Sequence, residues 1–340
     1  MHKLEHPVAT IATTASAHVL QVQDLKVHFP IRGGLLNRQV GTVYAVDGVS
    51  LSLQRGRTLG LVGESGCGKS TVGKAIVRLV EPTAGSVWID GKDITGLSRA
   101  PMRALRRRIQ MVFQDPYSSL NPRMRIADLI AEPLENFHLT TSREQTREKS
   151  VYLLSRVGLR ADAMDKYPHQ FSGGQRQRLG IARALAAEPG VIVADEPVSA
   201  LDVSVQAQVL NLLAELQQEL GLAYLFISHD LAVVKHISDD IAVMYLGRIV
   251  ETTSRQRLFT SPLHPYTQGL LVAAPVARPG FRKPTEMLEG EVPSPSRPPP
   301  GCRFHTRCPL VMDACRSVEP IMQTVRPGHS VACHRVETQV

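Results

Sequence analysis

Residues 63–71 read GESGCGKST, and this stretch decides the fold. It satisfies the pattern G-x-x-x-x-G-K-[ST], follows the apolar run TLGLV at 58–62 and opens the helical pattern KSTVGKAIVRLV. A strand, a glycine-rich turn and a helix in this order begin an α/β unit. The glycines let backbone N–H groups wind around phosphate oxygens, and the helix points its positive end at the same anion. The sequence therefore predicts a loop that binds nucleotide phosphates.

Two side chains of this loop have separate predicted roles. Lys69 supplies a positive charge toward the β and γ phosphates, and Ser70 places a hydroxyl on Mg²⁺. A chance match in a glycine-rich turn is disfavoured, because the stretch lies between a strand and a helix. The residues predicted to bind the nucleotide here are Gly63, Glu64, Ser65, Gly66, Cys67, Gly68, Lys69, Ser70 and Thr71.

Three further apolar runs extend the α/β pattern. They are IQMVF at 109–113, VIVAD at 191–195 and AYLFIS at 223–228, and near-continuous apolar runs are typical of buried parallel strands. Asp195 ends one of these strands and is predicted to hold the water shell of the metal. Glu196 follows it, where a general base for the attacking water is needed. The segment DIAVMYLGRIVE from 240 predicts two short strands around a turn.

Length and composition limit the class of protein. The chain has 340 residues, 43% hydrophobic and 21% charged, as expected of one large or two modest globular domains. It has neither a secretory signal pattern nor about 18 consecutive apolar residues, so we expect a cytosolic chain that does not span a membrane. The net charge of +8 suits polyphosphate, an anionic membrane surface or nucleic acid, or is simply a solvated basic surface. The run RALRRR at 103–108 has no interleaved aromatic residues, which disfavours nucleic-acid binding.

The stretch FSGGQRQR at 171–178 carries a family resemblance. Together with the phosphate loop and VIVADEP, it resembles the nucleotide-binding subunits of ATP-binding-cassette (ABC) transporters. A serine and two glycines at the start of a helix form a second anion site. In the family this signature motif binds the γ-phosphate of the ATP held by a partner subunit, so that two subunits sandwich two nucleotides. The residues that match it are Ser172, Gly173, Gly174 and Gln175.

The same resemblance assigns roles to four more residues. Tyr44 matches the aromatic residue that stacks on adenine. Gln114 matches the glutamine that reaches Mg²⁺ and links the site to a helical subdomain. Asp202, which ends SALD at 199–202, lies in the loop that crosses to the partner's site, and His229 resembles the switch histidine at the γ-phosphate.

Longer stretches of the sequence resemble one subgroup of this family. FQDPYSSLNPR, SPLHPYTQGLL and the run from PVSALDVSVQAQVL to YLGRIVE resemble the ATPase subunits of dipeptide/oligopeptide permeases. With YAVDGVSLSL, the chain looks most like the second ATPase of a dipeptide importer, although systems for nickel or glutathione share nearly all of this. The implied fold is an α/β P-loop NTPase core of ABC type. To this core it adds an antiparallel β subdomain, an inserted α-helical subdomain and a small cysteine-containing C-terminal extension.

The resemblance also implies a domain order and an assembly. We expect an N-terminal extension at 1–18, an ABC ATPase domain at 19–260 with its helical subdomain at about 115–185, and a C-terminal extension at 261–340. The implied partners are a second homologous ATPase, two membrane-spanning permease subunits and an extracytoplasmic binding protein, with no nucleic acid. The chain would lie on the cytoplasmic face of the inner membrane as a peripheral subunit. The rival is a soluble ABC-type ATPase that acts on DNA or ribosomes.

Four of the five cysteines gather in the tail after a proline-rich stretch at 275–300, in the spacing Cys302-x₅-Cys308-x₆-Cys315-x₁₇-Cys333. Disulfides are disfavoured in a reducing cytosol. Unliganded structural thiols remain open, and so does a zinc site completed by His305, His329 or His334. Four thiolates also suit a [4Fe–4S] cluster. The family resemblance implies the cluster, with zinc as the alternative, and a secondary role as a redox or metal sensor stays open.

Overall fold

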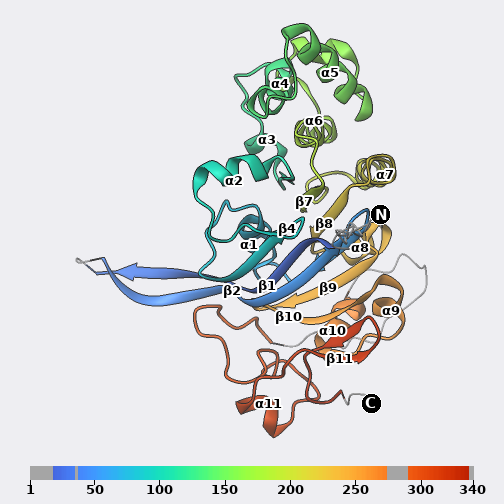
Figure 1. The fold of residues 1–340 in the computed structure, drawn as a ribbon. Coiled ribbons are helices and arrows are strands. Elements are labelled where there is room, and N and C mark those ends of the chain that lie inside the picture. Colours follow the sequence, from blue (N-terminus) through green and yellow to red (C-terminus); the bar gives the residue numbers. More distant parts are fainter. Residues whose placement is uncertain (1–17, 35–36, 274–289, 337–340) are drawn as a thin grey trace, which may run out of the picture.

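The protein is described by a computed structural model that covers residues 18–34, 37–273 and 290–336. Residues 1–17 of the expected N-terminal extension at 1–18 and most of the proline-rich stretch at 275–300 lie outside the described residues, and His18 begins the first strand. Figure 1 shows three levels: a helical part at the top, the sheets in the middle, and the C-terminal extension below them.

The larger sheet has eight strands, and five of them run parallel. In spatial order the strands are β11 (Gln323–Arg326), β12 (His329–Val331), β10 (Arg248–Ser254), β9 (Asp240–Tyr245), β3 (Thr58–Val62), β8 (Ala223–Ser228), β7 (Val191–Asp195) and β6 (Ile109–Val112). All residues of β3, β7 and β8 are buried, as their uninterrupted apolar runs predict. The strands predicted at 58–62, 109–113, 191–195 and 223–228 and the pair after 240 are confirmed.

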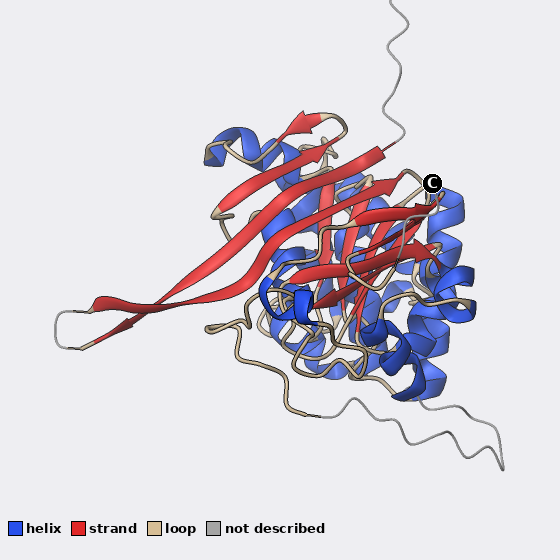
Figure 2. Cartoon of the chain, turned by 90° about the horizontal axis from the view of Figure 1, so that it is seen from below, coloured by secondary structure: helices blue, strands red, loops and turns tan. Residues whose placement is uncertain are grey.

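The smaller sheet is antiparallel and has the spatial order β2 (Arg38–Gln54), β1 (His18–Gly33), β4 (Ala84–Ile89) and β5 (Lys92–Asp93). β1 and β2 continue beyond the body of the molecule as a long two-stranded arm (Figure 2). One hydrophobic core fills the space between this sheet, the first helix and the larger sheet, and a second core joins the larger sheet to the helical part.

Helices make up the rest of the regular structure in the described ranges. They are α1 (Lys69–Ile76), α2 (Arg99–Arg106), α3 (Pro116–Ser119), α4 (Ile126–Asn136), α5 (Arg143–Arg156), α6 (Gly173–Leu185), α7 (Val203–Leu220), α8 (Leu231–Ile237), α9 (Arg255–Thr260), α10 (Pro265–Ala273) and α11 (Asp313–Ser317), with 3₁₀ turns at Ala161–Asp165 and Pro168–Gln170. Elements α3 to α6 lie between β6 and β7 in the chain and form the upper level of Figure 1.

Two features differ from the sequence pattern. The pattern KSTVGKAIVRLV predicts a longer first helix, but α1 ends at Ile76. Arg78 has a left-handed backbone with φ +56°, and its guanidinium donates to the carbonyls of Ile94 and Thr95, each at 2.5 Å. The extension, for its part, adds β11 and β12 to the edge of the larger sheet, where β12 pairs with β10. Within the described ranges, no helix is both long enough and apolar enough to cross a membrane.

Candidate functional site

The phosphate loop joins β3 to α1 and is shaped by close backbone contacts. A Cβ on Gly63 would lie 2.1 Å from the Met244 carbonyl oxygen, and one on Gly68 would lie 2.1 Å from that of Ala45, so both positions require glycine. The Lys69 side chain is buried and donates to the carbonyls of Gly63, at 2.8 Å, and Glu64, at 2.9 Å. The loop thus folds around Lys69, the first residue of α1, whose ammonium group is bonded to two carbonyls of the loop.

A hydroxyl and a carboxylate meet beside this loop. The Ser70 hydroxyl donates to Asp195 Oδ1 at 2.8 Å across 125 residues of sequence. Asp195 is 3% exposed at the end of β7, and burial raises the pKa of its carboxyl, although the bond from Ser70 opposes this rise. Hard oxygen ligands of this kind are those that Mg²⁺ prefers, so the two residues fit the predicted metal site.

Glu196 is held from two sides. Its Oε2 accepts a hydrogen bond from the Gln114 amide nitrogen at 2.9 Å, and its Oε1 lies 2.9 Å from His229 Nδ1. Glu196 follows Asp195 directly and has a left-handed backbone with φ +46°. The structure therefore brings three predicted catalytic residues, from three separate strand ends, into one hydrogen-bonded group.

The remaining predicted residues lie around this group without joining it. Ser172 and Gln175 form a capping box at the start of α6: Gln175 N–H donates to Ser172 Oγ at 3.4 Å, and Ser172 N–H to Gln175 Oε1 at 3.0 Å. Among the described residues, these two bond to each other and not to the phosphate loop. Asp202 is exposed at the start of α7. Tyr44 is half-buried on β2, with its ring edge-on to His28 at 4.8 Å between ring centroids.

The C-terminal extension contacts the site, which sequence reasoning missed. The Arg307 guanidinium forms a bidentate ion pair with Glu64 of the phosphate loop, at 2.8 and 3.0 Å. The backbone N–H of Glu64 donates to the Tyr266 hydroxyl at 2.9 Å. These partners are 243 and 202 residues away in sequence. The one available signal was that two arginines lie directly beside tail cysteines, in CRFHTRC at 302–308.

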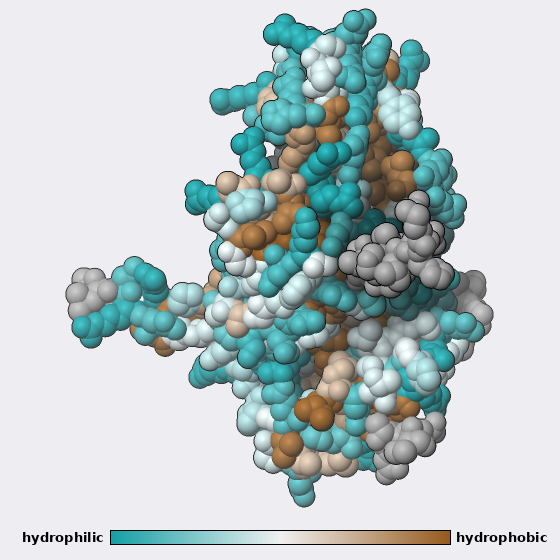
Figure 3. All heavy atoms as spheres, in the orientation of Figure 1, coloured by the Kyte–Doolittle hydropathy of each residue, from teal (hydrophilic) through white to brown (hydrophobic). Residues whose placement is uncertain are grey.

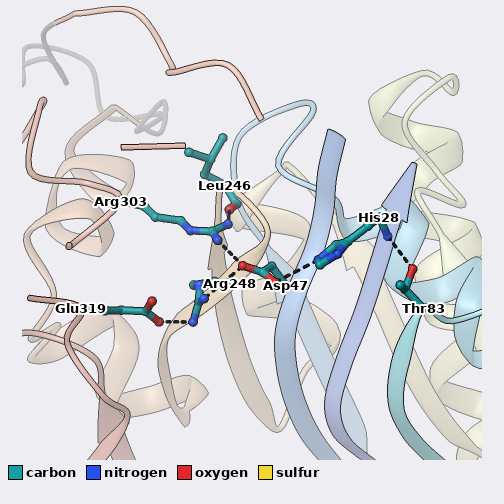
Figure 4. A network of polar contacts seen from close by, with 7 residues as sticks. All are labelled: His28, Asp47, Thr83, Leu246, Arg248, Arg303 and Glu319. Carbon is teal, nitrogen blue, oxygen red and sulfur yellow. Dashed lines mark hydrogen bonds and ion pairs between the residues drawn. The ribbon is translucent and has the colours of Figure 1, made fainter. Parts of the chain in front are cut away.

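A second contact from the extension reaches β2 (Figure 4). Arg303 pairs with Asp47, which also contacts His28 and Arg248, each at 3.0 Å. Burial opposes ionisation of Asp47, yet the charges of Arg303 and Arg248 and the bond with His28 leave the pKa of its carboxyl below the ordinary value. Asp47 is therefore a buried charge with partners on both sides.

The tail cysteines share one neighbourhood and are free thiols. Burial, together with the charges of the other three thiols, raises the pKa of Cys302 to about 11. Among the residues that the structure describes, no group of three or more His, Cys, Asp or Glu side chains is arranged to hold a metal ion. The histidines proposed for zinc bind elsewhere. His329 contacts Glu251 at 2.7 Å, His305 the Cys302 carbonyl at 2.8 Å and His334 the Val318 carbonyl at 2.9 Å.

Comparison with known proteins decides the family. Residues 46–199 match the model of the ABC transporter family, and residues 250–315 match that of the oligopeptide/dipeptide transporter C-terminal region. The chain is 54% identical to the oligopeptide transport ATP-binding protein AppF of Bacillus subtilis, over 93% of this chain and 97% of that protein. The chain belongs to the ABC transporter ATPases.

Other ABC relatives agree. The oligopeptide transport ATP-binding protein OppF of Escherichia coli is 52% identical over 94% of this chain and 96% of its own length. The dipeptide transport ATP-binding protein DppF of the same organism is 48% identical over 97% of this chain and 98% of its own length. A solved dimeric structure of the ATP-binding cassette MJ0796, bound to ADP and Pi, superposes with a TM-score of 0.62 at 28% identity, over 69% of this chain and 98% of that one. The ABC ATPase fold is therefore confirmed, and the chain is an ATPase.

Proposed function

We propose that this chain is the ATP-hydrolysing, nucleotide-binding subunit of an importer for dipeptides or oligopeptides, and that it drives uptake through separate permease subunits. The observation that carries the proposal is that one chain joins the residues needed for ATP hydrolysis to a C-terminal region of oligopeptide/dipeptide transporter type. The relatives that transport oligopeptides and dipeptides match it at similar identity, so the class of solute is peptides of either length.

The chemistry follows from the positions of three groups. Lys69 exchanges the loop carbonyls for the β and γ phosphates, and Glu196 accepts the proton of the attacking water. Gln114 and His229 hold the two carboxylate oxygens of Glu196, which fixes the direction in which this base acts. Ser70, Asp195 and Gln114 would hold Mg²⁺, which would supply positive charge to offset that of the phosphates.

Hydrolysis needs a second subunit in this proposal. Ser172 opens α6 with an exposed side chain, and its hydrogen bonds stay within the capping box, so the signature surface is open to another molecule. A helix start with free N–H groups suits the γ-phosphate of ATP held by a partner ATPase. The relative MJ0796 was solved as a dimer bound to ADP and Pi. We therefore expect a related ATPase chain to complete each site.

An apolar groove of about 300 Å³ supports docking to a permease. It lies between the end of α1, α2, β6 and α4, and Figure 3 shows apolar side chains gathered on this side of the molecule near α1 and α2. Three arginines and one glutamate also line it, so its charge is basic on balance and a permease segment with apolar and acidic side chains would fit; these residues are Arg103, Arg106, Arg183 and Glu132. α4 follows Gln114 through α3, which would connect this groove to the catalytic group. The chain would then sit peripherally on the cytoplasmic face of the inner membrane, with an extracytoplasmic binding protein supplying the peptide.

We also propose a ligand for the four cysteines of the tail. The four tail cysteines lie in one neighbourhood, and burial raises the pKa of three of their thiols, those of Cys302, Cys308 and Cys333. A thiol of this kind becomes a thiolate when a metal binds it. The family resemblance implies a [4Fe–4S] cluster on Cys302, Cys308, Cys315 and Cys333, and these side chains would have to move closer together to hold it, because the described residues show no group arranged to bind a metal ion. Anaerobically purified protein should then contain about four irons and four acid-labile sulfides per chain, and Cys315→Ser should lose both. Stoichiometric zinc without sulfide would replace the cluster with zinc.

Membrane recruitment tests the function against its rival. The chain should sediment with membranes only when the permease subunits of its importer are coexpressed, and Arg103→Glu, at an exposed arginine of the groove, should weaken this recruitment. Arg316→Glu, at an exposed arginine of the extension, is the matched control. Sedimentation that is independent of permease, together with copurifying nucleic acid or ribosomes, would instead support a soluble ABC-type ATPase.

A further inference from the structure

Residues 301–308 of the extension bind two separate elements of the nucleotide site. Arg303 pairs with Asp47 and donates to the Leu246 carbonyl at 2.5 Å, as Figure 4 shows. Asp47 is three residues beyond Tyr44 on β2. Arg307, four residues further along, pairs with Glu64 in the phosphate loop. One short segment thus connects the strand that bears Tyr44, the residue predicted to stack on adenine, to the phosphate loop.

These contacts are buried and geometrically specific. The side chains of Arg307 and Arg303 are 4% and 10% exposed, and those of their partners Glu64 and Asp47 are 25% and 12% exposed. A planar guanidinium that binds a carboxylate with two parallel bonds fixes both distance and direction. The ion pair between Arg307 and Glu64 is of this kind, so it determines where the backbone of Glu64 lies.

Glu64 is held from three directions. Arg307 holds its carboxylate, Tyr266 accepts its N–H, and Lys69 donates to its carbonyl. Of the three, Lys69 is the group that has to leave when it turns to the phosphates. The other two come from the extension and remain, so they keep the loop open while its lysine moves.

We propose that Arg303 and Arg307 are positioning residues for ATP binding, and that with Tyr266 they preorganise the phosphate loop and β2 before the nucleotide arrives. The inference rests on the proposed nucleotide site and adds that the extension sets its affinity. The segment begins and ends next to cysteines, Cys302 and Cys308, so the thiol neighbourhood anchors both arginines to the extension. Preorganised loops bind more tightly because less ordering is left to be done on binding.

A nucleotide titration of the full chain tests the proposal. Arg307→Met should weaken Mg-ATP binding on the order of tenfold, while the turnover number at saturating ATP in the assembled complex stays near the wild-type value. Arg307→Lys keeps the charge without the bidentate geometry and should weaken binding to an intermediate degree. Arg316→Met, an exposed arginine in α11, is the matched control and should bind like wild type.

A double-mutant cycle separates positioning from general stability. Glu64→Gln and Arg307→Met should act non-additively on affinity, because each breaks the same pair. If Arg307→Met does not fold, Tyr266→Phe removes only the hydroxyl that binds Glu64 and should still weaken binding. Wild-type affinity in whichever of these variants folds, or full additivity in the cycle, would overturn the proposal. Lys69→Ala separates a failure of the proposed nucleotide site from a failure of the positioning role. If Lys69→Ala binds ATP like wild type, the nucleotide site itself is wrong. If Lys69→Ala loses ATP binding and the other variants do not, only the positioning role is wrong.

Discussion

Glu196 adopts a backbone conformation that costs energy for any residue with a side chain. Its φ of +46° lies in the left-handed region, which disfavours a non-glycine residue by about 1 kcal/mol. The conformation persists because Gln114 and His229 hold the carboxylate and because the Glu196 N–H donates to the Ile227 carbonyl at 2.9 Å. Backbone strain of this kind is commonly found where a side chain has to be aimed.

Glu196→Gln should keep ATP binding and lower hydrolysis by roughly 10²–10⁴-fold, because an amide cannot accept the proton of the attacking water. Turnover should be measured site by site in the complex with the partner ATPase, since the two sites need not be equal. Glu215→Gln, at an exposed glutamate of α7, controls for the loss of charge. Wild-type turnover at the altered site would remove Glu196 from the role of base.

The residues of this site could be predicted to different extents. The phosphate loop and Asp195 follow from local pattern, because a glycine-rich turn and a buried strand are encoded within a few residues. Gln114 and His229 were assigned through family resemblance, since nothing local joins either of them to Glu196. The pairing of Glu64 with Arg307 was not predictable, because partners 243 residues apart meet only through the tertiary fold.

At the scale of elements, the start of α6 is a cap whose outer surface is exposed. Ser172→Arg should leave ATP binding by the isolated chain unchanged and should lower turnover in the complex, at the site whose phosphate loop belongs to the partner. The long cationic side chain would occupy the approach of the γ-phosphate. Ser142→Arg is the matched control, because Ser142 caps α5 through Gln145 N–H in the same way. Equal losses in both variants would show that only a cap was lost, at a cost of about 1 kcal/mol.

The start of α10 contains a buried histidine that predicts acid sensitivity. His264 Nδ1 accepts the Tyr266 N–H at 3.0 Å, and burial lowers the pKa of His264 to about 4 from an ordinary value of 6.5. Between these two values the unfolded chain binds more protons than the folded one, so stability falls as the pH falls. At pH 5 the loss should be about 2 kcal/mol relative to pH 8.

Urea unfolding measured at pH 8 and pH 5 checks this. His264→Asn keeps a hydrogen-bond acceptor but has no titrating group. Between pH 8 and pH 5 its free energy of unfolding should therefore fall by about 2 kcal/mol less than that of the wild type. His236→Asn, an exposed histidine in α8, should behave like wild type. A pH dependence in His264→Asn as steep as that of the wild type would mean that His264 is not the titrating group.

The elements themselves were predicted where they are buried on both faces. The runs TLGLV, VIVAD and AYLFIS became β3, β7 and β8 at the predicted residues, because uninterrupted apolar residues have one stable place in such a fold. β11 and β12 were not predicted. QTVR and HSV are short and mostly polar, and β12 is held by its backbone pairing with β10 and by the bond between His329 and Glu251.

At the scale of the whole molecule, the catalytic group and the signature surface of α6 are separate parts of one chain. The isolated ATPase should therefore hydrolyse ATP weakly, and its turnover should rise when the partner ATPase and permease are added. The check is turnover per chain against protein concentration. Full activity that does not change on dilution would show that one chain is enough.

In the proposed function, this ATPase powers peptide uptake through other subunits. The most direct measurement is peptide accumulation and ATP turnover in proteoliposomes that contain this chain, its partner ATPase and the permease, with binding protein supplied outside and ATP inside. We expect peptide-loaded binding protein to raise ATP turnover and labelled peptide to accumulate, and both effects should be lost with Lys69→Ala. Steady ATP hydrolysis that ignores the loaded binding protein and moves no peptide would contradict this function.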